Sequence, residues 1–228
     1  MRKDPKIQML RGLAIMAVVL IHSCPGGMGQ VLIRPFLNFC VPMFFFLSGH
    51  LTCLDRGDWL AFFRKRITRV LVPYVLWSII YTLMDGGGLW RLFSDLLTTN
   101  AAPQLYFVAV YIQFVLLTPL LGKLARSRYR WLGLLVSPVS LILFRYSCVL
   151  TGHEMNKYLM LLWREACLGH FTFYYLGLLT GNGLVAVPDS RKDPDFRKKL
   201  SICLALSILL QMAEGYGWMC LGVTDHGT

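Results

Sequence analysis

The chain has 228 residues, of which 56% are hydrophobic and only 15% are charged. With a mean hydropathy of +0.55, this composition excludes an ordinary soluble domain and predicts a multi-pass membrane protein in a lipid bilayer. The formal net charge of +11 does not indicate a nucleic-acid partner, because the basic residues are spread between apolar segments and do not form one stripe.

The predicted fold is an all-α, polytopic transmembrane helix bundle. Seven apolar segments each approach the length that spans a hydrocarbon core: 7–24, 31–54, 67–84, 105–122, 131–150, 160–187 and 200–223. The basic residues concentrate at the amino terminus and in the loops that follow the second, fourth and sixth segments. These positions share one side of the membrane when the segments alternate, so the positive-inside rule predicts a cytoplasmic amino terminus.

The first segment carries one arginine and one histidine, Arg11 and His22, in otherwise apolar sequence. At about 100° and 1.5 Å per residue they share a helix face and lie roughly 16 Å apart, which suits the two ends of an elongated ligand. Ionisable groups at this depth usually face a protein interior, a cavity or a substrate path. The alternative of a cleaved signal peptide lacks an A-x-A site, and further spans follow at once.

The second segment contains Pro42 and then runs MFFFLSGHL. Proline inside a membrane helix frees a backbone carbonyl, and Ser48 with Gly49 lets another helix approach closely. The pattern predicts a packed or bent helix beside a site. The alternative is that the three phenylalanines, Phe44 to Phe46, face lipid.

Two arginines stand at the start of the third segment, in FFRKRITRVLVPYVLW. Arg66 and Arg69 are three positions apart and share a helix face, so their guanidinium groups could bind one polyanion in a bidentate way. The alternative is that this basic cluster anchors topology and contacts lipid headgroups. The loop that follows the segment contains Gly86 to Gly88 but lacks the lysine of a P-loop, and it is interpreted as a flexible turn.

Polar residues in the later segments add weaker candidates. Tyr106 is near the start of LYFVAVYIQFVLLTPLL, which predicts a helix near a cavity, although an interfacial tyrosine explains it equally well. Glu214 is an intramembrane carboxylate, and its expected partner is one of the arginines already named. The seven cysteines show no C-x-x-C spacing, so neither a disulfide framework nor a metal site is predicted.

Several of these stretches resemble one family in its order. They are LRGLAIMAVVLIH, with Arg11 and His22 in the spacing R-x(10)-H, then FFFLSGHL, and then KRITRVLVPYVLW, with R-x-x-R before a proline. LYFVAVYIQFVLLTPLL, FTFYYLGLLTG and the Glu214 segment match more weakly. Together they cover nearly the whole chain and resemble the acyltransferase type 3 family of integral membrane acyltransferases, which modify sugars and cell-surface polymers.

The resemblance implies a single membrane-embedded acyltransferase-like domain over residues 1–228. Family members have more spanning helices than are predicted here, so the resemblance also implies that the last helices are missing. The family often has tryptophan where this chain has Tyr106, which leaves the role of that position open.

The resemblance further implies acyl transfer from acyl-CoA, with acetyl-CoA as the expected donor, to a hydroxyl of a carbohydrate or cell-envelope acceptor. No permanently bound cofactor is expected. In this interpretation His22 is the general base and Arg11 orients the donor's arm or thioester carbonyl. Arg66 and Arg69 hold the nucleotide phosphates, and the remaining substrate-binding candidates are Ser48, Tyr106 and Glu214.

Two other interpretations stay open on sequence alone. One is a non-catalytic, transporter-like domain in which Arg11, His22 and Glu214 line a path for a small polar solute or a proton. The other is an inactive fragment.

Overall fold

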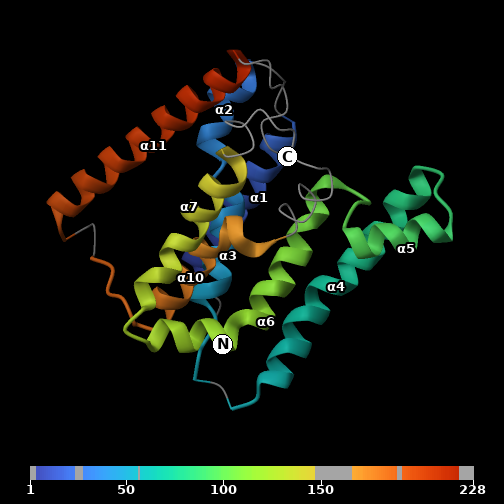
Figure 1. Cartoon of the computed structure of the whole chain (residues 1–228), viewed down its shortest axis with the longest axis horizontal. Coiled ribbons are helices and arrows are strands. Elements are labelled where there is room, and N and C mark those ends of the chain that lie inside the picture. Colours follow the sequence, from blue (N-terminus) through green and yellow to red (C-terminus); the bar gives the residue numbers. More distant parts are fainter. Residues whose placement is uncertain (1–3, 24–27, 56, 147–165, 189–191, 221–228) are drawn as a thin grey trace. The chain divides into compact units, whose positions relative to one another are not determined.

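The computed structural model describes residues 4–23, 28–55, 57–146, 166–188 and 192–220 (Figure 1). Within these ranges every regular element is helical, which confirms the predicted all-α class. The longer helices are α1 (Pro5–His22), α2 (Met28–Leu37), α3 (Cys40–His50), α4 (Trp59–Met84), α5 (Leu89–Thr98), α6 (Tyr106–Arg126), α10 (Phe171–Gly181) and α11 (Pro194–Cys220). Shorter elements are α7 (Val136–Leu141), the 3-10 helices η1 (Pro103–Leu105), η2 (Arg130–Leu135) and η4 (Cys167–His170), and the π-helix η3 (Ile142–Tyr146).

Five stretches of the described residues are long and apolar enough to cross a membrane: Pro5–His22, Val31–His50, Trp59–Met84, Tyr106–Arg126 and Pro194–Cys220. Each corresponds to one predicted segment, and the second joins α2 and α3 across a short break. The predicted spans 131–150 and 160–187 are described only in part, because residues 147–165 lie outside the described residues. The described remainder holds the short apolar stretch Arg130–Phe144 and the 11-residue α10, and the count of seven stays a prediction.

Two helices begin earlier than hydropathy predicts. α4 begins at Trp59, where the Asp58 carboxylate caps it by accepting a hydrogen bond from the backbone N–H of Ala61 at 2.9 Å. α11 begins at Pro194. Both starts are rich in lysine and arginine, which are good helix formers but are excluded from an apolar window. Hydropathy therefore locates the apolar part of each helix and misses the amino-terminal part that contains the basic residues.

The chain divides into two compact units, residues 1–48 with 185–228, and residues 49–184. In the first unit, the small residues Ala14 and Ala17 of α1 are buried against Cys40 at the start of α3. In the same unit, the side-chain amide of Asn38 donates to Gln211 of α11 at 2.8 Å. Small residues at helix contacts and hydrogen bonds between polar side chains are the usual means of holding membrane helices together.

The second unit is built around aromatic side chains of α6 and α10. The rings of Phe114 and Tyr174 stack with their centroids 4.6 Å apart, and both residues are fully buried. α10 also crosses the end of α3 at very short range. A Cβ atom added to Gly49 would overlap the carbonyl oxygen of Tyr174, and one added to Gly181 would overlap that of His50. The close helix approach predicted at Gly49 is confirmed.

The glycine-rich stretch after α4 is a defined turn. Gly86 has φ +67°, a left-handed conformation that favours glycine and commonly ends a helix. The next backbone N–H, of Gly87, donates to the carbonyl of Thr82 at 2.8 Å. α5 begins directly afterwards at Leu89, and the hydropathy pattern did not predict this helix.

Candidate functional site

α1 carries the first pair of candidates at the edge of its buried side. Around the helix, Arg11 and His22 lie about 60° and 80° from the buried Ala14, in the same direction. Arg11 is half-buried, whereas His22 is exposed. The two residues belong to one continuous helix, so the predicted shared face and separation of roughly 16 Å follow from its regular geometry.

Glu214 lies in the same unit, on α11. It is half-buried, and its carboxylate accepts a hydrogen bond from the indole N–H of Trp218, one turn further along the helix, at 3.2 Å. Beside it, Gly215 faces Val31 of α2 at van der Waals distance. Glu214 therefore lies next to the contact between α11 and α2.

Arg66 is the centre of a polar cluster inside the second unit. Its Nη1 donates to the Tyr111 hydroxyl, and its Nη2 donates to the Leu51 carbonyl and to the Thr52 hydroxyl, each at 3.3 Å. The guanidinium also lies over the Phe62 ring, 5.4 Å from its centroid. Three elements thus converge on one cation: α4, α6 and the segment after α3.

The cluster continues into the buried interior through hydroxyl groups. Thr52 is hydrogen-bonded to the Tyr174 hydroxyl, which in turn lies 2.8 Å from Thr118 Oγ1. Thr118 also donates to the carbonyl of Phe114, one turn earlier in α6, at 2.8 Å. These buried groups are satisfied by one another, which avoids the cost of an unpaired polar atom in an apolar interior.

The two arginines predicted to bind one polyanion have different surroundings. Arg66 is half-buried and turned toward Tyr111 and Thr52, whereas Arg69 is exposed. The joint role of Arg66 and Arg69 in binding phosphates stays a prediction.

The segment that contacts Arg66 is held in place by Asn182, just after α10. Its side-chain oxygen accepts from the Leu54 N–H at 2.9 Å, and its side-chain nitrogen donates to the Thr52 carbonyl at 2.9 Å. Two residues earlier, the Thr180 hydroxyl lies 3.2 Å from Nδ1 of His50. The Gly49 crossing and these bonds fix the backbone that presents Thr52 to the arginine.

Three other predicted positions are placed by the structure. Ser48 is buried, directly before the Gly49 crossing. Phe45 is fully buried, so the alternative that Phe44 to Phe46 all face lipid is wrong for this ring. Tyr106 is half-buried at the start of α6, and its ring centroid lies 6.5 Å from that of His170.

A hollow of about 390 Å³ lies beside the segment that follows α3, between the start of α4 and the end of α6. Its lining includes the side chains of Trp59, Lys123 and Arg126, and Arg126 pairs with Asp55 at its wall. The hollow thus combines an aromatic ring with basic groups on the predicted cytoplasmic side. Among the described residues no three His, Cys, Asp or Glu side chains come together as a metal site would require.

The sequence pattern did not predict the polar cluster that contains Arg66. Thr52, Tyr111 and Tyr174 come from three different segments, and nothing in their local pattern connects them. The available signal was a hydroxyl-bearing residue inside each apolar run, which in a membrane protein often marks a buried polar contact.

Comparison with known proteins gives one match. A family model described as an acyltransferase domain matches residues 4–223. No curated protein and no solved structure matches the chain.

Proposed function

The chain belongs to the acyltransferase type 3 family, and from this membership we propose that it moves an acyl group, with acetyl as the expected one, from acyl-CoA to a hydroxyl of a sugar or cell-envelope acceptor. The match runs from residue 4 to residue 223, so it includes parts of both units. Candidate spanning helices occur in each unit, and they support catalysis by a multi-pass membrane protein.

In the proposed reaction, His22 is the general base. Its imidazole accepts the proton of the acceptor hydroxyl while that oxygen forms an ester bond with the acyl carbon. The carbon–sulfur bond of the thioester breaks, and coenzyme A leaves as a thiolate that takes up a proton. Histidine suits this role because imidazole gains and loses protons near physiological pH. Arg11, on the same helix face, orients the donor's arm or its carbonyl.

The observation that carries the proposal is the placement of this pair on α1. An exposed imidazole and a half-buried guanidinium share one side of a helix that is otherwise apolar from Met9 onward. Charged groups in membrane helices are costly and usually functional. The separation of roughly 16 Å between the two residues along the helix also suits the two ends of a thin, extended donor.

A direct assay separates the proposed activity from solute transport. The full chain in liposomes is supplied with acetyl-CoA and candidate sugar acceptors, and free coenzyme A thiol is measured alongside uptake of labelled sugar. We expect thiol release that depends on the acceptor and forms an ester product. Uptake of labelled sugar without acceptor-dependent thiol release would contradict the proposal and support a transporter.

We propose that Arg66 and Arg69 bind the donor's phosphates, and exchange of each for lysine tests this. Lysine keeps the charge but cannot match the planar fork of arginine. Arg66→Lys is expected to raise KM for acetyl-CoA by about 10- to 100-fold, the equivalent of one lost charge-assisted hydrogen bond, and to lower thermal stability, since its contacts to Tyr111 and Thr52 are lost.

The exposed Arg69 provides the matched comparison. Arg69→Lys is expected to raise KM for acetyl-CoA while the melting temperature stays the same, because this side chain is exposed. If Arg66→Lys lowers the melting temperature but leaves KM for acetyl-CoA unchanged, its role is to hold the helices together and the phosphate assignment is wrong.

A further inference from the structure

α5 presents three different surfaces around its axis. At about 100° per residue, one arc contains the buried Asp95 and the half-buried Leu92 and Leu96. A second arc is polar and contains Ser94, Thr98 and Arg91. The third is apolar and strongly exposed: Leu89 87%, Trp90 83%, Phe93 56% and Leu97 71%. Such a large apolar surface needs a partner other than water.

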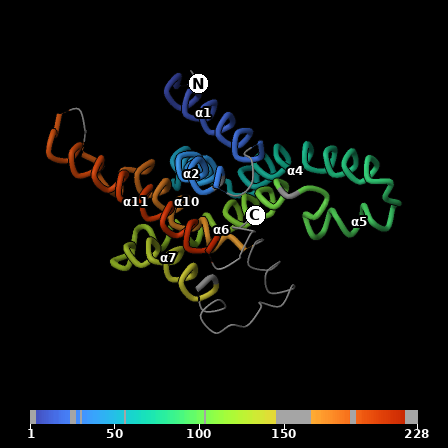
Figure 2. The backbone as a smooth tube through the Cα atoms, turned by 90° about the horizontal axis from the view of Figure 1, so that it is seen from above, coloured from blue at the N-terminus to red at the C-terminus, as the bar shows by residue number. Residues whose placement is uncertain are grey.

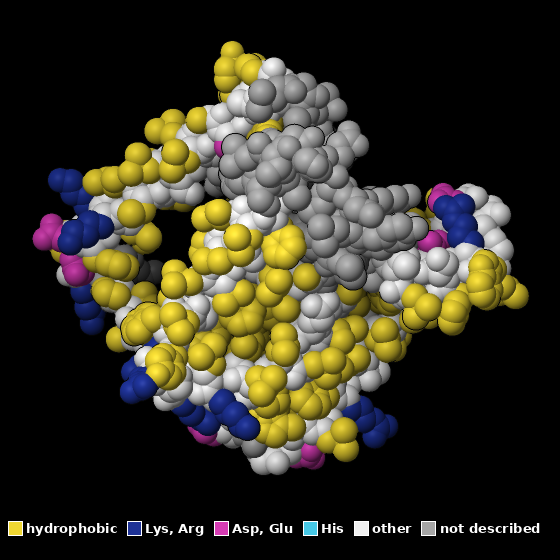
Figure 3. Space-filling view, viewed as in Figure 1, with side chains coloured by type: hydrophobic (Ala, Val, Ile, Leu, Met, Phe, Trp, Pro, Cys, Tyr) yellow, Lys and Arg dark blue, Asp and Glu magenta, His cyan; other side chains and the backbone are white. Residues whose placement is uncertain are grey.

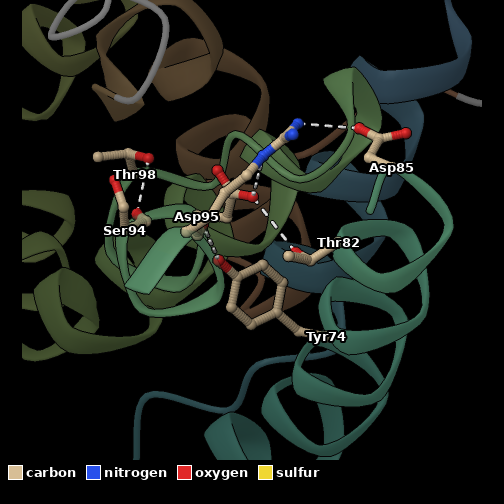
Figure 4. A network of polar contacts seen from close by, with 7 residues as sticks. Tyr74, Thr82, Asp85, Ser94, Asp95 and Thr98 are labelled. Carbon is tan, nitrogen blue, oxygen red and sulfur yellow. Dashed lines mark hydrogen bonds and ion pairs between the residues drawn. The ribbon is translucent and has the colours of Figure 1, made fainter. Parts of the chain in front are cut away.

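The first arc packs against α4. The Tyr74 hydroxyl donates to the carbonyls of Asp95 and Leu96 at 3.3 and 2.9 Å, and the Thr82 hydroxyl donates to the Asp95 carboxylate at 3.2 Å (Figure 4). The chain therefore turns at the glycines and folds back beside the last turns of α4, as Figures 1 and 2 both show. α4 and α5 form a helical hairpin.

The depth of this hairpin follows from the charges on α4. Arg69 is the last charged residue of that helix, and the stretch from Val70 to Met84 is about 22 Å long at 1.5 Å per residue. A hydrocarbon core is about 30 Å thick. If Arg69 marks one membrane boundary, Met84 lies about 8 Å short of the other, still inside the hydrocarbon core. A helix packed beside Tyr74 and Thr82 then lies at the level of the acyl chains.

The charges of the hairpin are arranged as this depth requires. Arg91 forms an ion pair with Asp85 at 2.9 Å and a longer one with Asp95 at 3.7 Å. Of these three residues, Asp95 lies furthest from the turn between the two helices, and it is also the most buried, with its side chain 12% exposed. Ionisable groups at membrane depth are normally paired in this way, whereas an aqueous loop has no such need.

The exposed arc of α5 continues a lipid-facing surface. The neighbouring end of α4, Leu83 and Met84, is also strongly exposed and apolar. In Figure 3, apolar side chains cover one side of the hairpin end, and acidic and basic side chains gather on the opposite side. Trp90, close to the turn, is where an interfacial tryptophan belongs. Acyl chains therefore fit this surface better than a second copy of the chain.

We propose that α5 is a re-entrant helix embedded in the leaflet opposite the basic end of α4, with its apolar arc against the lipid acyl chains. The 85–104 connection is then part of the membrane-embedded structure and not an aqueous loop. The residues that meet lipid are Leu89, Trp90, Phe93 and Leu97.

Photo-crosslinking of two neighbouring positions tests this placement at one depth. A photoreactive benzophenone analogue of phenylalanine is introduced at Phe93 or at Ser94 in the full chain, which is then reconstituted in phosphatidylcholine liposomes with alkyne-tagged acyl chains. After illumination, we expect several-fold more lipid adduct at Phe93 than at Ser94, because about 100° separates the two side chains around the helix. Equal adducts at both positions, or capture of a second chain at Phe93, would overturn the proposal.

A second measurement uses a conservative variant. The fluorescence lost in Trp90→Phe isolates the contribution of that indole among the chain's tryptophans. We expect brominated acyl chains to quench this contribution and the water-soluble quencher acrylamide to leave most of it. Quenching by acrylamide with no effect of brominated lipid would place α5 in water.

Discussion

His22→Ala is expected to lower kcat for acyl transfer by about 10²- to 10⁴-fold, the contribution typical of a positioned general base. The loss should appear in kcat more than in KM for the donor, because the imidazole acts on the acceptor's proton as the ester bond forms. The measurement is acceptor-dependent release of coenzyme A thiol by the full chain in liposomes. Insertion is checked by the amount and size-exclusion profile of the purified variant.

Two comparisons make this test specific. Ser23→Ala changes the adjacent exposed residue and should leave the rate near that of the unaltered chain. Free imidazole added to His22→Ala should restore part of the lost rate, because a small base can occupy the space left by the side chain. Transfer by His22→Ala at the unaltered rate would remove His22 from the mechanism.

Gly49→Ala and Gly181→Ala are each expected to destabilise the second unit severely. The added Cβ atoms would overlap the carbonyl oxygens of Tyr174 and His50, respectively. Backbone atoms cannot rotate away as a flexible side chain can, so α3 and α10 must separate. Overpacking of this kind costs roughly 2 to 4 kcal/mol. In a chain of this size that corresponds to a melting temperature lower by about 5 to 15 °C.

The measurement is retention of a monodisperse size-exclusion peak in detergent after heating. Gly217→Ala is the matched control, because nothing lies within 4 Å of its added Cβ atom, and alanine in a helix interior is about 1 kcal/mol more favourable than glycine. The double variant of Gly49 and Gly181 should lose less than the sum of the two single losses, since one separation of the helices relieves both overlaps. Unchanged stability of both single variants would contradict the observed backbone contact.

Much of the architecture was predictable because lipid imposes simple local requirements. A helix that crosses a membrane needs about 20 apolar residues, and hydropathy located the apolar part of α1, α4, α6 and α11. Hydropathy averaged over a span of that length missed α5, because the apolar residues of this 10-residue helix occupy only one arc. It also could not show that Arg130–Phe144 is made of short 3-10, α and π elements, since composition does not specify the hydrogen-bonding pattern.

The candidate site was predictable to a similar degree. The spacing of Arg11 and His22 settles their shared face once α1 is helical, because the rotation per residue is fixed. The surroundings of Arg66 and Arg69 were not predictable in this way. Spacing treats the two arginines as equivalent, but Tyr111 and Thr52 hold Arg66 inward while Arg69 is exposed.

The sequence by itself determined the membrane class, the family and the positions of its charged residues along the helices, since these depend on composition and on motifs in order. Only the tertiary structure decided which residues meet. The Asn182 side chain accepts a hydrogen bond from the Leu54 N–H, 128 positions away in the chain. The end of α3 and α10 contact each other at two glycines, and a glycine has no side chain whose type could indicate the contact. Such contacts depend on how helices pack in space, and local periodicity contains no information about that packing.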